Sequence, residues 1–137
     1  MNPSSGNAAD INPHHHPGQG LAVLAESLYL ANLLVTPGIA FAALLWLWFK
    51  HKDSAPPLAR QHLGQTTFVS VVGGILIVCL SGALVAMGGL HQPWTWVLVI
   101  TYFVCIHGAL VLLGMFGLAK AMAGQTWRYP IIGPGSL

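Results

Sequence analysis

The fold is decided by residues 66–90, TTFVSVVGGILIVCLSGALVAMGGL, and by residues 94–119, WTWVLVITYFVCIHGALVLLGMFGLA. Neither stretch contains an aspartate, glutamate, lysine or arginine. Each is longer than the roughly 20 apolar residues that an α-helix needs to cross a bilayer. Only His91, Gln92 and Pro93 separate the two stretches, so the helices must run antiparallel and adjacent. The sequence therefore predicts a hairpin of two membrane-spanning helices.

A third apolar stretch, residues 21–49, precedes this hairpin. It contains Pro37-Gly38, which we interpret as a kink within one helix, because proline bends transmembrane helices without necessarily ending them. Its first part carries Glu26, which we expect to be solvated or paired with headgroups at the membrane surface. We thus expect an all-α integral membrane protein with three transmembrane helices, spanning about 21–49, 66–90 and 94–119 within one domain, 21–137.

The composition agrees with a membrane protein and excludes other classes. Charged residues make up 6% of the 137 residues and hydrophobic residues 55%, against about 25% charged residues in an average globular chain. Lipids are therefore expected to cover most of the surface. A net charge of +2 without a basic, aromatic stripe argues against nucleic acid as a partner. Residues 1–20 are polar and rich in Pro, Gly, Ser and Asn, which predicts a disordered tail without a signal peptide.

The positive charges predict the orientation. All five lie in the first predicted loop or after the last span: Lys50, Lys52, Arg60, Lys120 and Arg128. By the positive-inside rule, three spans place the C-terminus in the cytoplasm and the N-terminus outside. We therefore expect a multi-pass protein of a bacterial inner membrane. The predicted interface anchors are Trp46, Trp48, Trp127, Arg128 and Tyr129 on the inner side and Trp94 and Trp96 on the outer side.

Small residues recur along the second and third predicted spans. The positions are Ser70, Gly74, Gly82 and Gly89 in one span and Gly114 and Gly117 in the other. In lipid, small side chains let helix backbones approach closely, and so mark helix–helix interfaces. The stripe is explained either by packing within the three-helix bundle or by docking of another integral membrane subunit.

Histidines are the remaining candidates for chemistry. His107 lies near the middle of a span, where an ionisable group marks a possible site; the plainer interpretation is a neutral histidine bonded to a neighbouring helix. His91 is sixteen residues away, about 24 Å along a helix, too far to share one haem with His107. His14, His15 and His16, with His91 predicted on the same side, could bind transition metals weakly. No catalytic motif is recognisable, so we expect no enzyme activity and no tightly bound cofactor.

Two short motifs resemble those of a family of small, uncharacterised bacterial membrane proteins. The first is Leu58-Ala59-Arg60-Gln61-His62-Leu63-Gly64-Gln65, beside the family pattern His-Ala-(Lys/Arg)-Gln-Ala-Leu-Asn-Phe. The second is the tail in which Gly124 is followed by Trp127, Arg128, Tyr129, Pro130 and Ile131. That family is distantly similar to a chloroplast inner-envelope import translocon subunit and to magnetosome membrane proteins. The resemblance covers roughly residues 28 to 133 and implies a three-span bundle without an established activity.

These observations favour a non-catalytic accessory or scaffold subunit of a larger inner-membrane complex. Two alternatives stay open. One is a membrane module that binds a metal or cofactor through the histidines. The other is a homo-oligomeric protein resembling a translocon or channel.

Overall fold

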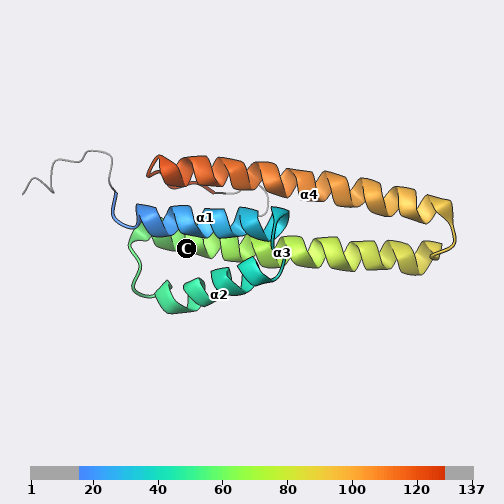
Figure 1. The fold of residues 1–137 in the computed structure, drawn as a ribbon, viewed down its shortest axis with the longest axis horizontal. Coiled ribbons are helices and arrows are strands. Elements are labelled where there is room, and N and C mark those ends of the chain that lie inside the picture. Colours follow the sequence, from blue (N-terminus) through green and yellow to red (C-terminus); the bar gives the residue numbers. More distant parts are fainter. Residues whose placement is uncertain (1–15, 129–137) are drawn as a thin grey trace, which may run out of the picture.

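The computed structural model describes residues 16–128, which form an all-helical structure. It has four α-helices: α1 (Gln19–Leu34), α2 (Ile39–His51), α3 (Pro57–Gly88) and α4 (Pro93–Met122). The chain makes a short hairpin, α1–α2, followed by a long hairpin, α3–α4 (Figure 1). The predicted all-α class and the long hairpin are confirmed. The predicted tail of residues 1–20 lies largely outside the described residues, and its last two residues, Gln19 and Gly20, belong to α1.

The apolar stretch 21–49 is two helices, so the prediction of one kinked helix was wrong. Residues 35–38 form a turn, and α2 runs back beside α1 (Figure 1). Pro37 has no backbone N–H and disfavours a helical conformation in the residue before it. Gly38 has a φ of 88°, which favours glycine, and its N–H donates to Asn32 Oδ1 at 2.9 Å. Proline and glycine together thus reverse the chain here instead of bending one helix.

The connection before α3 is shorter than the sequence suggested. We expected a polar loop up to Gln65, but the helix already begins at Pro57. Proline is favoured in the first turn, where its missing N–H would have no partner within the helix. Pro93 begins α4 in the same way. The polar segment Pro57–Gln65 is therefore the first part of a long helix that becomes apolar further along.

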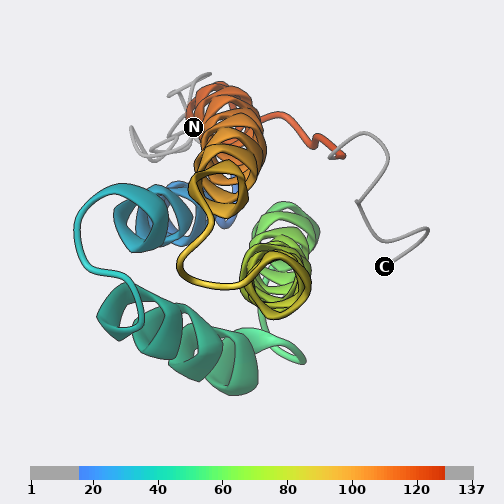
Figure 2. The ribbon, with the colours of Figure 1, turned by 90° about the vertical axis from the view of Figure 1, so that its right-hand side faces the viewer.

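The short hairpin lies against one half of the long hairpin. Helix α1 packs against α2, α3 and α4, while α2 packs against α1 and α3. The end view shows α1 and α2 beside the α3–α4 pair, with the α3–α4 turn facing the viewer (Figure 2). One half of the molecule is therefore a four-helix bundle, and the other half consists of α3 and α4 alone.

Small residues on α4 make room for α1. A Cβ atom at Gly114 would lie 2.5 Å from Cε1 of Tyr29, and one at Gly117 would lie 2.5 Å from a carboxylate oxygen of Glu26. The Tyr29 hydroxyl donates to the Leu110 carbonyl oxygen at 3.0 Å. The two glycines predicted to mark an interface thus lie where α1 and α4 meet, inside the chain's own bundle.

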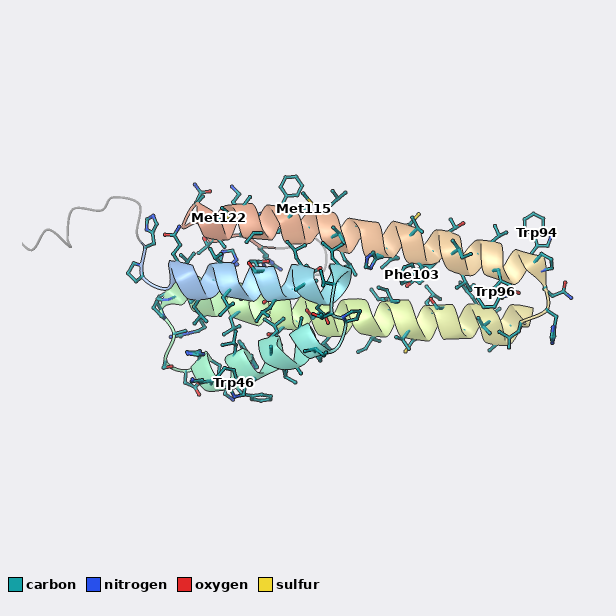
Figure 3. The ribbon with its side chains drawn as sticks, viewed as in Figure 1. Trp46, Trp94, Trp96, Phe103, Met115 and Met122 are labelled. Carbon is teal, nitrogen blue, oxygen red and sulfur yellow. The ribbon has the colours of Figure 1, made fainter. Side chains whose placement is uncertain are left out.

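The outer surface is apolar along the long hairpin. Helices α3 and α4 are long and apolar enough to cross a membrane, and most of their apolar stretches are exposed. Large side chains such as Met87, Val78 and Val104 are 87%, 70% and 60% exposed. Side chains of this kind project outward along both helices (Figure 3). Exposure of this extent matches a lipid environment.

Glycine replacement will test the α1–α4 contact. We expect Gly114→Ala to destabilise the protein by about 1–3 kcal/mol, because the added methyl meets the Tyr29 ring. The matched control is Gly108→Ala on the same helix, since nothing lies within 4 Å of a Cβ there. Thermal unfolding in detergent will compare the two variants. Equal stability of both would contradict the packing described here.

Candidate functional site: a buried polar core and an open glycine face

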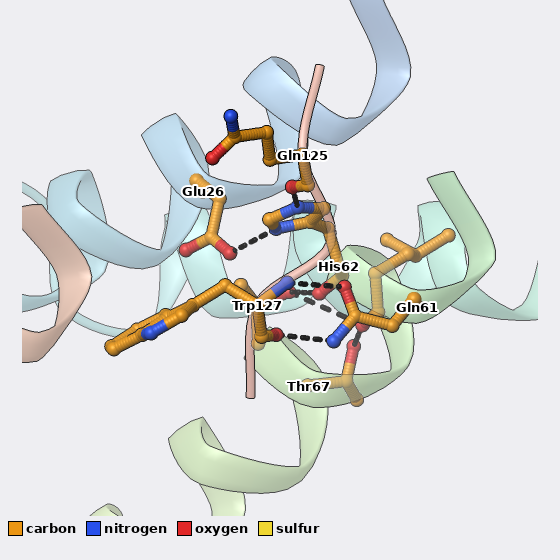
Figure 4. A network of polar contacts seen from close by, with 8 residues as sticks. Glu26, Gln61, His62, Thr67, Gln125 and Trp127 are labelled. Atoms are coloured by element: carbon orange, nitrogen blue, oxygen red, sulfur yellow. Dashed lines mark hydrogen bonds and ion pairs between the residues drawn. The ribbon is translucent and has the colours of Figure 1, made fainter. Parts of the chain in front are cut away.

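A histidine and a glutamate are bonded to each other inside the four-helix half. His62 Nδ1 on α3 is 2.6 Å from Glu26 Oε1 on α1, and both side chains have no exposed surface. His62 Nε2 lies 2.8 Å from the carbonyl oxygen of Gln125, in the segment that follows α4 (Figure 4). One imidazole therefore joins α1, α3 and the C-terminal segment.

The hydrogen bonds restrict the protonation of this pair. A carbonyl oxygen only accepts, so the short contact with Gln125 requires a proton on His62 Nε2. A second proton must lie between Nδ1 and Glu26 Oε1, whether it belongs to the imidazolium or to the carboxylic acid. In both forms the pair as a whole is neutral. A neutral, fully bonded pair can be buried where an isolated charge would be very costly.

Glu26 was expected to be solvated at the membrane surface, and that expectation was wrong. The carboxylate is fully buried because α1 packs its face against the small residues of α4 and the start of α3. The sequence did carry a signal, since Glu26 is the only acid in an apolar stretch and needs a buried partner. His62 was not considered as that partner because the predicted loop placed it outside any helix.

The C-terminal segment is tied to α3 by a second side chain. The Trp127 N–H donates to Gln61 Oε1 at 3.3 Å, and Gln61 Nε2 donates to the Trp127 carbonyl oxygen (Figure 4). The Trp127 ring packs beside Phe116, with centroids 6.3 Å apart. The two motifs that carried the family resemblance, one before the second predicted span and one in the tail, thus contact each other. These contacts hold the segment after α4 against α3.

The glycines of α3 fall into two groups. A Cβ at Gly73 would lie 2.9 Å from Leu110 Cδ1, and one at Gly88 would meet Thr95, so these two positions pack α3 on α4. At Gly74 and Gly82 nothing lies within 4 Å of the added atom. Gly89 is equally open, but its φ of 79° shows that it serves the turn after α3. On α3, the predicted stripe of small residues therefore has open space beside it at Gly74 and Gly82.

A cavity of about 240 Å³ lies at the tip of the short hairpin. Polar side chains line it from three helices: Asn32, Ser70 and His107. The His107 ring stacks on Phe103, with centroids 5.1 Å apart and planes 12° apart. Ser70 Oγ is buried and has no hydrogen-bond partner. His107 thus borders an apolar cavity and is only partly buried.

The two described histidines of the predicted metal site, His16 and His91, lie at opposite ends of the molecule. His16 precedes α1, and its ring lies beside Gly124, after α4, whereas His91 lies in the α3–α4 turn at the opposite end. Helix α4, with 30 residues and a length of about 45 Å, separates the two ends. His14 and His15 lie outside the described residues. Between residues 16 and 128, no three His, Cys, Asp or Glu side chains are grouped to hold a metal ion.

The predicted anchors lie at both ends of the long hairpin. Trp94 and Trp96 are 75% and 45% exposed beside the α3–α4 turn, and Trp46 is 59% exposed near the end of α2 (Figure 3). Trp48 is partly buried and packs on the core formed by Ala25, Leu44, Leu47 and Leu63. Trp127 is also partly buried, against the bundle. Arg128 is exposed, and Tyr129 lies outside the described residues.

A comparison with known protein families identifies the family of this chain. The model of the magnetosome magnetite crystal formation protein family, MamF/MmsF, matches residues 18–135. The chain belongs to this family. It is a multi-pass membrane protein, in agreement with the two long apolar helices. The magnetosome part of the predicted resemblance is thereby confirmed. No curated protein and no solved structure matches this family member.

Substitution of the buried pair will test its contribution to stability. We expect Glu26→Leu or His62→Leu alone to cost about 3–5 kcal/mol, because each leaves a buried polar partner unsatisfied. The double variant Glu26→Leu/His62→Leu should lose less than the sum of the single losses. Unfolding in mixed detergent micelles measures these differences, and Asp53→Asn, at an exposed acid, is the control. Additive losses would show that the two side chains do not interact.

Proteolysis will test the closure of the tail. Arg128 is exposed and follows Trp127 directly. Trypsin cleavage after Arg128 therefore reports how often the segment after α4 detaches from α3. We expect Gln61→Ala to accelerate this cleavage several-fold, because both hydrogen bonds to the Trp127 backbone are lost. Gln92→Ala, in the exposed turn at the other end, should cleave at the wild-type rate. An unchanged rate in the Gln61 variant would contradict the closure.

Proposed function

We propose that this family member is a non-catalytic scaffold subunit of a larger complex in a magnetosome-type membrane derived from the bacterial inner membrane. The observation that carries the proposal is the open, small-residue face of α3 at Gly74 and Gly82. The proposed partner is a transmembrane helix of another integral membrane protein. The cationic end of the molecule faces the cytoplasm in this proposal, by the positive-inside rule.

The way helices associate in lipid supports a transmembrane helix as the partner on this face. In lipid, apolar side chains gain nothing by leaving one apolar environment for another, so association depends on close packing and interhelical hydrogen bonds. Gly74 and Gly82 lie two helical turns apart and permit close approach of a second backbone. Space for the close approach of a partner helix is therefore available at these two positions of α3.

The charge of the chain supports a role in the membrane more than direct contact with a mineral. The family is described by magnetite crystal formation, and iron is bound in proteins largely by carboxylate, imidazole and thiolate groups. This chain has three acidic residues in total, and Glu26 is buried against His62. The α3–α4 turn carries no acid. We therefore propose that it contributes to crystal formation by organising membrane partners.

Pull-down from mild detergent will test the proposal. The tagged wild-type protein should recover another integral membrane protein at fixed stoichiometry, identified by mass spectrometry. Gly74→Leu and Gly82→Leu should lower that recovery at least several-fold, because leucine fills the approach surface. Ala83→Leu places the same side chain on an exposed position of a different face of α3 and should bind as the wild type does.

Two results would overturn the proposal. One is recovery of a free monomer under mild extraction. The other is equal loss of the partner in the Ala83→Leu control. Co-expression of two differently tagged copies distinguishes the homo-oligomeric alternative, in which each copy captures the other through the same face.

A further inference from the structure

The short hairpin does not have the length to cross a bilayer. Helices α1 and α2 contain 16 and 13 residues, which correspond to about 24 Å and 20 Å at ~1.5 Å per residue. A hydrocarbon core is about 30 Å thick. Because α2 returns beside α1, both ends of this hairpin lie at the same end of the molecule (Figure 1).

The tip of the hairpin lies at mid-depth of the long hairpin. Asn32 and Pro37 border the same cavity as Gly73 and His107. His107 is 13 residues from Trp94 (107 − 94) and 13 residues from Lys120 (120 − 107), or about 20 Å from each along the helix. The tip therefore reaches the middle of the apolar part of α4.

The chemistry of the tip suits hydrocarbon rather than water. Leu34, Val35 and Ile39 are 60%, 74% and 75% exposed, and residues 33–49 carry no charge. Irregular backbone at membrane depth requires internal hydrogen bonds. The turn has them: the Gly38 N–H donates to Asn32 Oδ1, and the Thr36 N–H donates to the Ala31 carbonyl oxygen at 2.9 Å.

The base of the hairpin carries the positive charges. Lys50 Nζ lies 4.6 Å from the centre of the Trp46 ring, and Lys52 Nζ lies 5.7 Å from that of Phe49. Gln19, at the start of α1, donates to the carbonyl oxygen of Met122, at the end of α4. The beginning of α1, the end of α2 and the end of α4 thus share one end of the molecule. Aromatic rings beside lysines are typical of a headgroup layer.

We propose that α1–α2 is a re-entrant hairpin that enters only the leaflet on the cationic side and turns back at the bilayer midplane. The chain then crosses the membrane twice, through α3 and α4, and Gln19 lies on the same side as Arg128. The single-helix interpretation of residues 21–49 had placed the N-terminus on the other side. Four helices displace lipid in one leaflet and two in the other, so the molecule is a wedge that favours a membrane convex toward its cationic face.

Single cysteines will test the topology in sealed membranes of one orientation. The background is Cys79→Ser/Cys105→Ser, and the sites are exposed in the structure: His16→Cys, Thr36→Cys, Ser54→Cys, Gln92→Cys and Ala123→Cys. A membrane-impermeant maleimide should label the His16, Ser54 and Ala123 variants from the cytoplasmic side and the Gln92 variant from the opposite side. The Thr36 variant should react only after the membrane is dissolved.

Two labelling patterns would overturn the re-entrant hairpin. One is labelling of the His16 variant from the side of Gln92, which would mean that residues 19–51 cross the bilayer. The other is labelling of the Thr36 variant in intact membranes, which would place the tip in water. Both readouts are independent of partner binding through Gly74 and Gly82, so this test does not depend on the scaffold proposal.

Membrane sorting will test the wedge. The protein is reconstituted in giant vesicles so that its cationic end faces outward, and narrow membrane tubules are pulled from them. The protein density on the tubules should then exceed that on the parent vesicle. With the cationic end inward, the protein should be depleted from tubules. Equal density in both orientations would overturn the wedge shape even where the labelling supports the hairpin.

Discussion

The bonded pair of Glu26 and His62 is the interaction on which the four-helix half depends. It places the carboxyl group of α1 and the imidazole of α3 at 2.6 Å from each other inside the bundle, and neither side chain has exposed surface. Because the carbonyl oxygen of Gln125 accepts from the second ring nitrogen, the same residue also fixes the segment after α4. The neutral total charge of the pair lets this linkage exist in an apolar bundle, where a lone carboxylate would be expelled.

Glycines on α4 leave room for the side chains of α1 that make these hydrogen bonds. Gly117 leaves the volume that the Glu26 carboxylate occupies, and Gly114 leaves the volume of the Tyr29 ring. Tyr29 in turn donates to the backbone of α4 at Leu110, so two successive turns of α1 are bonded to neighbouring elements. Packing and hydrogen bonding therefore select the same register of α1 on α4. A shift of one turn would place side chains against the glycines in the wrong order and leave the carboxylate unbonded.

The sequence predicted the helical class, the long hairpin and its turn at His91–Pro93 because long uncharged stretches have few structural solutions. It failed at residues 35–38, where Pro37 and Gly38 are compatible with either a kink or a reversal, and tertiary contacts of α1 decide between them. It also placed Gln61 and His62 in a loop, because a polar segment between apolar ones is usually a connection. Their partners, Trp127 and Gln125, are more than sixty residues away, and no local pattern indicates such a contact.

The two halves of the molecule differ in how their polar and small residues are packed. In the four-helix half, Glu26 and His62 are buried and bonded to each other. Beyond the tip of the short hairpin, α3 and α4 have only each other, so Gly88 faces Thr95 and Gly82 stays uncovered. Gly74 lies beside the tip and also has open space at its Cβ position. A lipid-exposed glycine contributes nothing to helix stability and costs about 1 kcal/mol relative to alanine in a helix interior. The proposed scaffold function gives these two positions of α3 a role, because the close approach of another helix in the membrane requires small residues there.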